Sequence, residues 1–415
     1  MRDRAIVSSL LEADFYKFTM LQMILKYHPD VPVEFSFINR TKSVQLAKAI
    51  DLGELREHLD HCRDLTFTSQ ELHYLMGTYE YEQPMFRYDF VQRLQFLRLS
   101  EFSLSQTTSG QLDLRFFGPW AAATLWETLA LSIVNELYFA SLMKGMSRFE
   151  RQVVEAEGRR RLAEKIRMLR QFPGVMFSEF GNRRAFSRAW EGYVVGVFKE
   201  ELPLQFRGTS NTWLAQKYGV MPMGTNAHEP PMVYSGIYHD QDDEDPVFSQ
   251  RRVLDDWESL YVGGLLLFLP DTWSSDWFFD KVATVDRLRK WRGSRQDSGN
   301  PIMYARKRIG NYQAAGIDPR EKLIVFADGL DVQKMCGLNT ALTGKIQDGY
   351  GWGTNATNDL GFNPISIVVK ATKAAGHPVI KLSDNIEKAT GDPAEIERVK
   401  RLIGYDVTLA EACKY

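Results

Sequence analysis

The sequence predicts an α/β protein, an irregular parallel α/β barrel joined to a smaller mixed α+β domain. The chain has 415 residues, more than a usual single domain contains. After about residue 140, short apolar runs alternate with helical stretches, as in parallel α/β proteins. Polar turns follow these runs, as they do at the active face of a barrel. We expect the mixed domain over 1–135, rejoined by 365–415, and the barrel domain over 136–364.

The first third of the chain mixes helix and strand. Apolar residues of segment 10–27 lie near one face at helical spacing, which predicts a helix. Apolar residues alternate with polar ones in 33–37 and again in 112–116, which predicts two strands. Segment 121–143 is apolar, but charged residues such as Glu127 interrupt it. It therefore reads as a buried amphipathic helix and not as a bilayer span.

The predicted barrel strands are short apolar runs. Segment 262–269 is apolar and ends at Pro270, a length that suits a buried strand. Runs 323–326 and 365–369 also end in polar residues. We expect the turns after these strands to gather at one face, where a barrel carries its active site.

Composition excludes several classes of protein. The 51 basic and 53 acidic residues give a formal net charge of -2, so we expect neither nucleic acid nor a membrane as partner. The cysteines, Cys62, Cys336 and Cys413, are odd in number and scattered, which favours free thiols in a reducing compartment. The N-terminus lacks the apolar core of a signal peptide. We therefore expect a cytoplasmic protein.

Segment 207–229 has the composition of a ligand site. The small polar turns Gly208–Asn211 and Gly224–Ala227 suit close approach of backbone N–H groups to an anion. Apolar residues between them recur at helical spacing. His228 and Glu229 follow directly. These features predict an anion-binding site beside a histidine.

Three later segments point to a sugar phosphate. In 295–301, Arg295 can bind phosphate through both arms of its guanidinium, and Asp297 can accept ribose hydroxyls or hold a magnesium-bound water. Segments 326–331 and 351–359 add glycine-containing turns. Two successive anion-binding loops late in an α/β barrel commonly form a phosphate-binding site.

Competing motifs fit less well. Segment 351–356 matches the spacing of a dinucleotide fingerprint, but no hydrophobic strand precedes it. Segment 337–346 departs from the P-loop spacing, and His228-Glu229 lacks the second histidine of a zinc protease. The acidic run 240–245 favours a solvated loop, with metal binding as the alternative.

Seven motifs in order resemble the nicotinate phosphoribosyltransferase family over some 370 residues. They are 10–17, 178–184, 207–229, 295–301, 326–331, 351–359 and 379–384. The resemblance implies transfer of ribose 5-phosphate from phosphoribosyl pyrophosphate to nicotinate, giving nicotinate mononucleotide and pyrophosphate. It also implies a homodimer whose opening motif completes the neighbour's site.

The resemblance assigns residues to each part of the site. The partner's Tyr16 and this chain's Phe180 would sandwich the pyridine ring, and Arg183 would face its carboxylate. Asp14 and Asp271 would lie nearby. The phosphoribosyl group would meet Arg295, Asp297, Ser298, Gly329, Gly353 and Thr354. Mg²⁺ would be held through pyrophosphate and water, with no direct protein ligand.

Two residues would set specificity and energy coupling. Related nicotinamide enzymes resemble this chain but carry Asp where Ser210 stands, and a hydroxyl can donate to the nicotinate carboxylate that an Asp would repel. His228 matches the histidine that the family phosphorylates from ATP, with an orienting histidine as the alternative. Glu229 is a candidate for fixing the tautomer of His228.

Two alternative functions stay open. The chain could use nicotinamide or another pyridine as the base, or it could be a catalytically silent homologue that binds nucleotides.

The chain departs from the family pattern at three places. Pro230-Pro231 follow Glu229 where an aromatic residue is usual, which stiffens the chain and removes two N–H groups. Asn300 stands where Asp is general, and Ala327 where Ser is common. Altered ATP coupling and an altered magnesium or pyrophosphate preference are the expected consequences.

Overall fold

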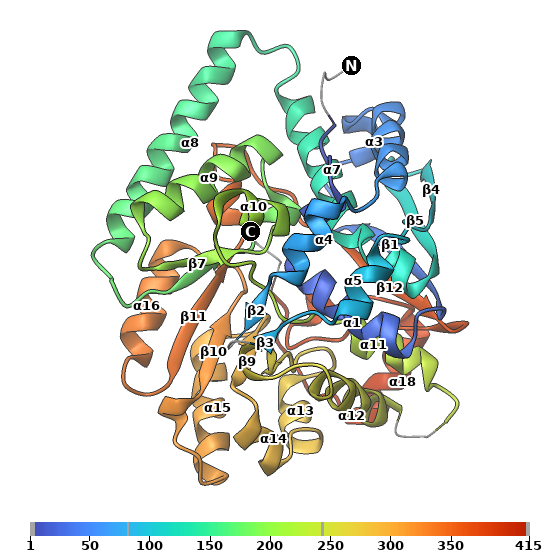
Figure 1. The fold of residues 1–415 in the computed structure, drawn as a ribbon, viewed down its shortest axis with the longest axis vertical. Helices are drawn as coiled ribbons and strands as arrows, with labels where there is room; N and C mark the ends of the chain where they lie inside the picture. The colour runs from blue at the N-terminus through green and yellow to red at the C-terminus, as the bar shows by residue number, and fades with distance from the viewer. Residues whose placement is uncertain (1–4, 81–82, 242–244, 412–415) are drawn as a thin grey trace.

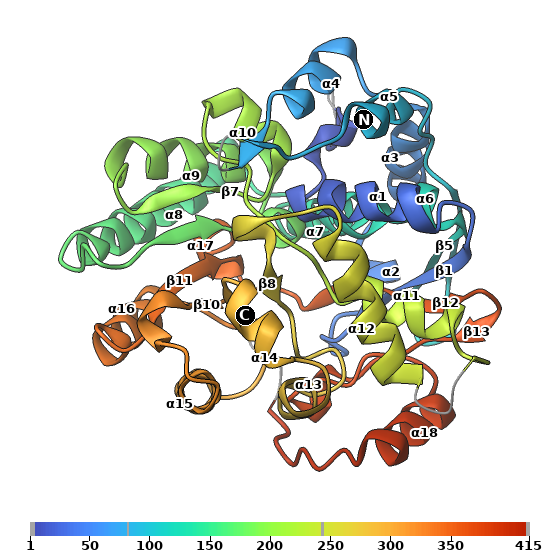
Figure 2. The same cartoon turned by 60° about the horizontal axis from the view of Figure 1, so that its bottom comes forward.

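Two sheets organise the chain, and helices surround them (Figures 1 and 2). A computed structural model describes residues 5–80, 83–241 and 245–411. One sheet is antiparallel with five strands, and the other is parallel with six. The predicted α/β class is therefore confirmed. The domain boundaries at 135/136 and 364/365 stay predictions.

The antiparallel sheet joins distant parts of the sequence. In spatial order its strands are β13 (His377–Pro378), β12 (Ile367–Ala374), β1 (Pro32–Asn39), β5 (Leu112–Pro119) and β4 (Glu101–Gln106). Strand β1 alternates buried and less buried residues, as its sequence predicts. Run 365–369 does not end before Lys370 as a barrel strand, although its sequence predicts this. It continues to Ala374 because the strand pairs antiparallel with β1 along its length. Lys370 Nζ on this strand donates to buried Glu127 at 3.0 Å.

The parallel sheet carries the predicted polar turns. In spatial order its strands are β7 (Phe206–Thr209), β6 (Phe177–Glu179), β11 (Gln347–Trp352), β10 (Leu323–Phe326), β9 (Gly293–Gln296) and β8 (Leu267–Phe268). Strand β10 has the predicted bounds. Strand β8 is shorter than predicted because Gly263–Leu265 forms a 3₁₀ turn. Among the described residues no pairing joins β7 to β8, so this ladder is open on one side.

Helices occupy most of the remaining chain. In the first half they are α1 (Phe15–Tyr27), α2 (Leu46–Ala49), α3 (Leu52–Asp64), α4 (Ser69–Met76), α5 (Tyr88–Leu94), α6 (Trp120–Ala123), α7 (Trp126–Leu142), α8 (Arg148–Leu169) and α9 (Arg188–Glu201). In the second half they are α10 (Thr212–Tyr218), α11 (Glu229–Ile237), α12 (Asp245–Glu258), α13 (Ser275–Lys281), α14 (Val285–Lys290), α15 (Pro301–Ala314), α16 (Val332–Leu342), α17 (Thr354–Thr357) and α18 (Pro393–Ile403). A short hairpin pairs β2 (Tyr79–Glu80) with β3 (Gln83–Pro84).

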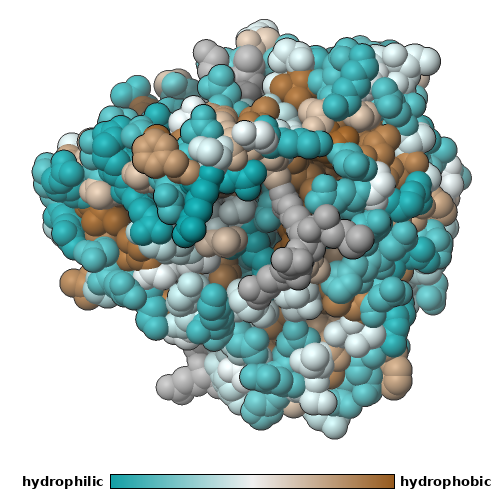
Figure 3. Space-filling view, turned by 90° about the horizontal axis from the view of Figure 1, so that it is seen from above, coloured by the Kyte–Doolittle hydropathy of each residue, from teal (hydrophilic) through white to brown (hydrophobic). Residues whose placement is uncertain are grey.

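Two predicted helices are each divided. Segment 10–27 begins as the 3₁₀ turn Leu10–Glu12 and resumes as α1 after Asp14, whose extended backbone starts the helix. Segment 121–143 lies within α6 and α7, and most of α7 is buried. No helix among the described residues is long and apolar enough to cross a membrane. The face shown in Figure 3 is mostly hydrophilic with scattered hydrophobic patches.

The cysteines and the acidic run are only partly described. Cys62 and Cys336 are free and buried. Cys413 and residues 242–244 of the acidic run lie outside the described residues.

Helix α11 packs tightly on the antiparallel sheet. It contacts β12 and α12, and all but its last residue are buried. Gly236 lies where the helix meets the sheet, since a Cβ there would stand 2.7 Å from the Ala374 carbonyl oxygen. A Cβ added to Gly337 in α16 would have no atom of any described residue outside that helix within 4 Å. A side chain would therefore clash at Gly236, which is buried, and would fit at Gly337, which is exposed.

We expect opposite stability effects from adding one methyl group to each glycine. Gly236→Ala should destabilise by about 1–3 kcal/mol through overpacking. Gly337→Ala should stabilise by up to about 1 kcal/mol, because alanine loses less backbone entropy in a helix. Thermal unfolding of both variants tests this. Equal melting temperatures for the two variants would contradict the close α11–β12 contact.

Candidate active site

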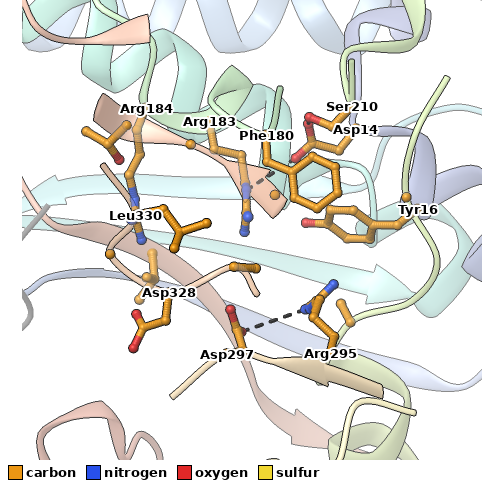
Figure 4. A pocket seen from close by; sticks show the side chains of 18 of the residues that line it. Asp14, Tyr16, Phe180, Arg183, Arg184, Ser210, Arg295, Asp297, Asp328 and Leu330 are labelled. Atoms are coloured by element: carbon orange, nitrogen blue, oxygen red, sulfur yellow. Dashed lines mark hydrogen bonds and ion pairs between the residues drawn. The ribbon is translucent and has the colours of Figure 1, made fainter. Parts of the chain in front are cut away.

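A polar cavity of about 390 Å³ opens between the two sheets. Residues that follow the carboxyl ends of five parallel strands line its wall, among them Phe180 after β6, Ser210 after β7, Asp297 after β9, Asp328 after β10 and Gly353 after β11. Parallel strands present such residues at a common edge, which is where open α/β sheets bind ligands. Figure 4 shows how several of these side chains lie.

One end of the cavity holds two aromatic rings and an arginine. Tyr16, Phe180 and Arg183 all line it and belong to the same chain (Figure 4). The resemblance implies that the partner's Tyr16 completes the site, and that contribution stays a prediction. Within this chain, the Phe15 N–H donates to the Ser210 carbonyl at 2.7 Å, which ties the start of α1 to the end of β7.

A glycine makes this docking possible. Gly224 has a positive φ of 153°, and a Cβ there would lie 2.9 Å from the Tyr16 nitrogen. Only a residue without a side chain fits at this distance. The second small-residue turn therefore receives the opening segment of the chain, whereas its sequence suggested direct contact with an anion.

Asp14 connects the arginine to the predicted specificity residue. Its carboxylate lies 3.2 Å from Arg183 Nε and accepts a hydrogen bond from Ser210 Oγ at 2.8 Å. Burial raises the pKa of Asp14, and the Arg183 charge opposes that shift. Asp14, Arg183 and Ser210 thus form one connected group at the aromatic end of the cavity.

Glu127 is the centre of a buried charge cluster beneath the rings. It lies 2.8 Å from Lys17 Nζ and 3.0 Å from Lys370 Nζ, and 3.5 Å from Arg183 Nη1. The Tyr16 hydroxyl donates to it at 3.2 Å. Burial alone would raise the pKa of Glu127, but the three cations hold it well below its ordinary value. This carboxylate therefore fixes both an aromatic ring and the guanidinium.

Glu229 belongs to the same cluster and not to the histidine beside it. Its carboxylate lies 2.5 Å from Lys17 Nζ and accepts from Trp120 Nε1 and Thr124 Oγ1, each at 2.7 Å. The expectation that Glu229 fixes the tautomer of His228 is wrong, since adjacent side chains point apart here. The Glu229 carboxylate therefore stabilises the buried cluster around Lys17 and does not contact His228.

His228 is held by other partners at the wall of the cavity. Its Nε2 lies 3.0 Å from Asp297 Oδ2, and its Nδ1 lies 3.0 Å from Thr272 Oγ1. Burial, reinforced by the charge of Lys381, lowers the pKa of His228 to about 4. The imidazole is therefore neutral near pH 7 and keeps a nitrogen lone pair.

Two expected contact residues lie behind the wall. Asp271 and Ser298 are buried, and neither lines the cavity. The Ser298 hydroxyl donates to Asp271 Oδ2 at 2.6 Å, and Lys381 Nζ lies 3.4 Å from the same oxygen. The structure therefore gives them supporting positions, with the Ser298 hydroxyl already occupied.

The rest of the cavity lining, the cationic end, gathers cations and glycine turns. Its lining includes Arg184, Arg295, Lys334, Lys381, Lys388, Gly329, Gly353 and Thr354. Arg295 Nη1 donates to the Asn226 carbonyl at 3.0 Å, and Lys388 Nζ donates to the Asp297 carbonyl at 2.6 Å. This density of positive charge suits a ligand with several phosphate oxygens.

The three departures from the family pattern take ordinary structural places. Pro230 and Pro231 occupy the first turn of α11, where a missing N–H costs nothing. The Asn300 side chain caps α15 by accepting from the Met303 N–H at 3.0 Å. Ala327 lines the cavity. Asn300 can cap as well as Asp, so its lost charge does not disturb the fold.

Several lining residues were not singled out from the sequence. They are Arg40, Glu127, Arg184, Lys334, Lys370, Lys381 and Lys388. Glu127 carried a signal, because a carboxylate inside an apolar helix must find a buried partner. The lysines of the last fifty residues reach the cavity only because β12 returns to β1, which the local sequence does not reveal.

One group at the wall could hold a divalent cation. Ligand atoms of His228, Asp271 and Asp297 lie within 4.8 Å of one another. Asp271 Oδ1 is buried and has no hydrogen-bond partner among the described residues. Carboxylate oxygens are the ligands that Mg²⁺ prefers, so these two aspartates fit that ion better than the histidine does.

Known proteins share this architecture. Residues 175–406 match the model of the nicotinate phosphoribosyltransferase family, and residues 11–135 match its N-terminal domain. A nicotinate phosphoribosyltransferase structure from Porphyromonas gingivalis is 30% identical, with 96% of this chain and 100% of that chain covered and a TM-score of 0.84. One from Vibrio cholerae is 29% identical, covering 98% and 96%, with a TM-score of 0.86.

The fold and the cavity together define an α/β protein with a cationic cavity whose wall carries two aromatic rings. Both family matches extend over the residues that build this cavity. The chain belongs to the nicotinate phosphoribosyltransferase family.

Removing the charge at the centre of the buried cluster should be costly. We expect Glu127→Gln to destabilise by about 3–5 kcal/mol, because it leaves buried cations without their partner. Glu34→Gln is the control: its pairs with Arg115 and Lys373 are partly exposed, and it should cost less than about 1 kcal/mol. Denaturant unfolding of both variants measures the difference. Similar losses of unfolding free energy in the two variants would show that the buried cluster contributes no more to stability than a surface ion pair.

Proposed function

We propose that this chain transfers ribose 5-phosphate from phosphoribosyl pyrophosphate to nicotinate, the first step of NAD salvage from nicotinate. The observation that carries the proposal is the placement of Tyr16, Phe180 and Arg183 in one cavity with the cationic end. The rings suit a flat heterocycle, and the guanidinium suits its carboxylate. Family membership supports the same reaction.

The chemistry needs positioning more than proton transfer. The pyridine nitrogen attacks the sugar carbon C1, the C1–oxygen bond to pyrophosphate breaks, and the ring nitrogen becomes cationic. Because this nitrogen carries no proton to lose, no general base is required. Ring stacking contributes on the order of 0.5–1.5 kcal/mol beyond area burial, enough to orient the base without trapping it. The lysines and arginines stabilise the departing charge.

The cationic end supports the phosphoribosyl group. We assign the 5-phosphate and pyrophosphate to the turns at Gly329 and Gly353 with Thr354, and to Arg295 and neighbouring lysines. Mg²⁺ would neutralise pyrophosphate oxygens when bound. Asp297 and Asp271 are the residues that would hold it, directly or through water. Asp297 also remains available to ribose hydroxyls.

We further propose that His228 is phosphorylated by ATP. Its neutral ring can attack the γ-phosphorus, forming an N–P bond as ADP leaves. Thr272 and Asp297, each 3.0 Å from a ring nitrogen, orient the imidazole. Hydrolysis of this phosphohistidine would drive the ribosyl transfer forward. Pro230 and Pro231 pack within α11 and leave the histidine side chain at the cavity.

Labelled ATP tests this coupling. The wild type should accept acid-labile, base-stable phosphate and form more nicotinate mononucleotide with ATP than without it. His228→Ala should accept no label and lose the ATP stimulation, while keeping transfer from phosphoribosyl pyrophosphate. No pyrophosphate release from phosphoribosyl pyrophosphate and nicotinate, with or without ATP, would instead favour the silent homologue and reject the proposed function.

Ser210 should set the choice of base. Its hydroxyl lies 2.8 Å from Asp14 Oδ1, so Ser210→Asp would bring a second carboxylate to this end of the cavity. We expect a more than about tenfold fall in nicotinate kcat/KM and a gain for nicotinamide, whose amide N–H groups an Asp can accept. Ser210→Ala removes the hydroxyl without adding charge and should not gain nicotinamide activity. Equal rates of the wild type with nicotinate and nicotinamide would contradict a role for Ser210 in choosing the base.

The resemblance supports a homodimer in which the opening motif of each chain completes the neighbour's site. A site that uses the chain's own Tyr16, which lines the cavity here, is the alternative. Mixing inactive Tyr16→Ala with inactive Phe180→Ala tests this. If each chain uses its own Tyr16, the mixture stays inactive. If a partner supplies Tyr16, mixed dimers contain one intact site and activity returns.

A further inference from the structure

A second cluster of metal-binding side chains lies at the far end of α11. His228 precedes the helix, and His239 follows it, one helix length of about 13 Å away. His239, Asp240 and His377 each offer one ligand atom, and these atoms lie within 4.8 Å of one another. None of the three lines the active-site cavity. The proposed reaction therefore leaves this group unexplained.

The carboxylate of Asp240 already bridges the two imidazoles. Its Oδ1 lies 2.8 Å from His239 Nδ1, and its Oδ2 lies 3.5 Å from His377 Nε2. In a tetrahedral zinc site with bonds of about 2.0–2.1 Å, neighbouring ligand atoms are roughly 3.3 Å apart. The two distances lie on either side of that value, but they run to different carboxylate oxygens. The carboxylate and both imidazoles would therefore adjust to bind one ion.

The two rings can make that adjustment. Their centroids are 4.3 Å apart with planes 14° from parallel, so both rings must rotate to aim a lone pair at one ion. Their side chains are 25% and 31% exposed, which leaves room for the rotation. The Asp240 side chain is 75% exposed, so the open coordination positions face water.

The backbone holds the ligands close together from two separate elements. His377 begins β13, which pairs with β12 through the two-residue turn Ala375-Gly376. Both turn residues have positive φ, 51° and 90°, as a tight hairpin turn requires. Helix α11 contacts β12 and β13. An ion bound here would therefore link the end of α11 to the β12–β13 hairpin.

We propose that His239, Asp240 and His377 form a binding site for one late first-row divalent cation, with Zn²⁺ as the reference ion. Two imidazoles and one carboxylate are ligands that zinc uses, and water would complete the coordination. Imidazole nitrogens select against Mg²⁺, which prefers oxygen. The acidic run 240–245 thus contributes Asp240 to a metal site, the alternative that its sequence left open.

Zinc titration of the full chain without a histidine tag tests the proposal. After chelator treatment at pH 7.5, calorimetry should show one Zn²⁺ per chain, and Co²⁺ should give the visible absorption of a nitrogen- and oxygen-ligated ion. Zn²⁺ should also raise the melting temperature. His377→Ala and Asp240→Asn should each weaken binding at least about tenfold and abolish the thermal shift. His61→Ala, an exposed histidine on α3, is the matched control and should change neither.

One further variant separates this cluster from the active site. His228→Ala removes one side chain of the second group of possible metal ligands found in 5–80, 83–241 and 245–411. It should leave Zn²⁺ affinity unchanged if the ion sits at the end of α11. The proposal is overturned if His228→Ala abolishes binding while His377→Ala does not, or if the wild type binds no Zn²⁺. Neither outcome depends on ribosyl transfer, so the proposed function is tested separately.

Discussion

The buried carboxylate of Glu127 is the constraint on which the site depends. It comes from α7 and meets Lys17 from α1, Arg183 after β6 and Lys370 from β12. A buried charge is tolerated only when it is paired, so these elements must assemble together. The same contacts hold the Tyr16 ring and the Arg183 guanidinium. Packing between the two sheets and preparation of the base-binding end are therefore one event.

The cavity wall combines two sets of groups. In one set, Asp14 and Ser210 share a hydrogen bond beside Arg183, so a bound carboxylate would meet a cation whose neighbours are already fixed. The other set consists of glycine turns and lysines, which give the wall positive charge. His228 lies at the wall near Asp297 and is neutral because burial disfavours its charged form.

Local sequence patterns predicted much of this arrangement, and long-range pairing decided the rest. Alternation in 33–37 and the run 323–326 gave strands because each pattern reflects burial of its own segment. The segments after the parallel strands were recognisable because function requires small and charged residues there. The sequence predicted the return of 365–415 to the mixed domain but not the strand that β12 pairs with, so the contact of Lys370 with Glu127 was missed. The position of Glu229 beside His228 in the sequence also could not reveal that Glu229 binds Lys17. His228 instead forms its hydrogen bond with Asp297.

The central proposal is that the rings of Tyr16 and Phe180 clamp nicotinate and that Arg183 binds its carboxylate. A crystal structure with bound nicotinate tests it most directly. The account predicts the pyridine ring between a Tyr16 ring and a Phe180 ring, with the carboxylate within hydrogen-bonding distance of the Arg183 guanidinium. Nicotinate bound away from Phe180 and Arg183 would contradict the account.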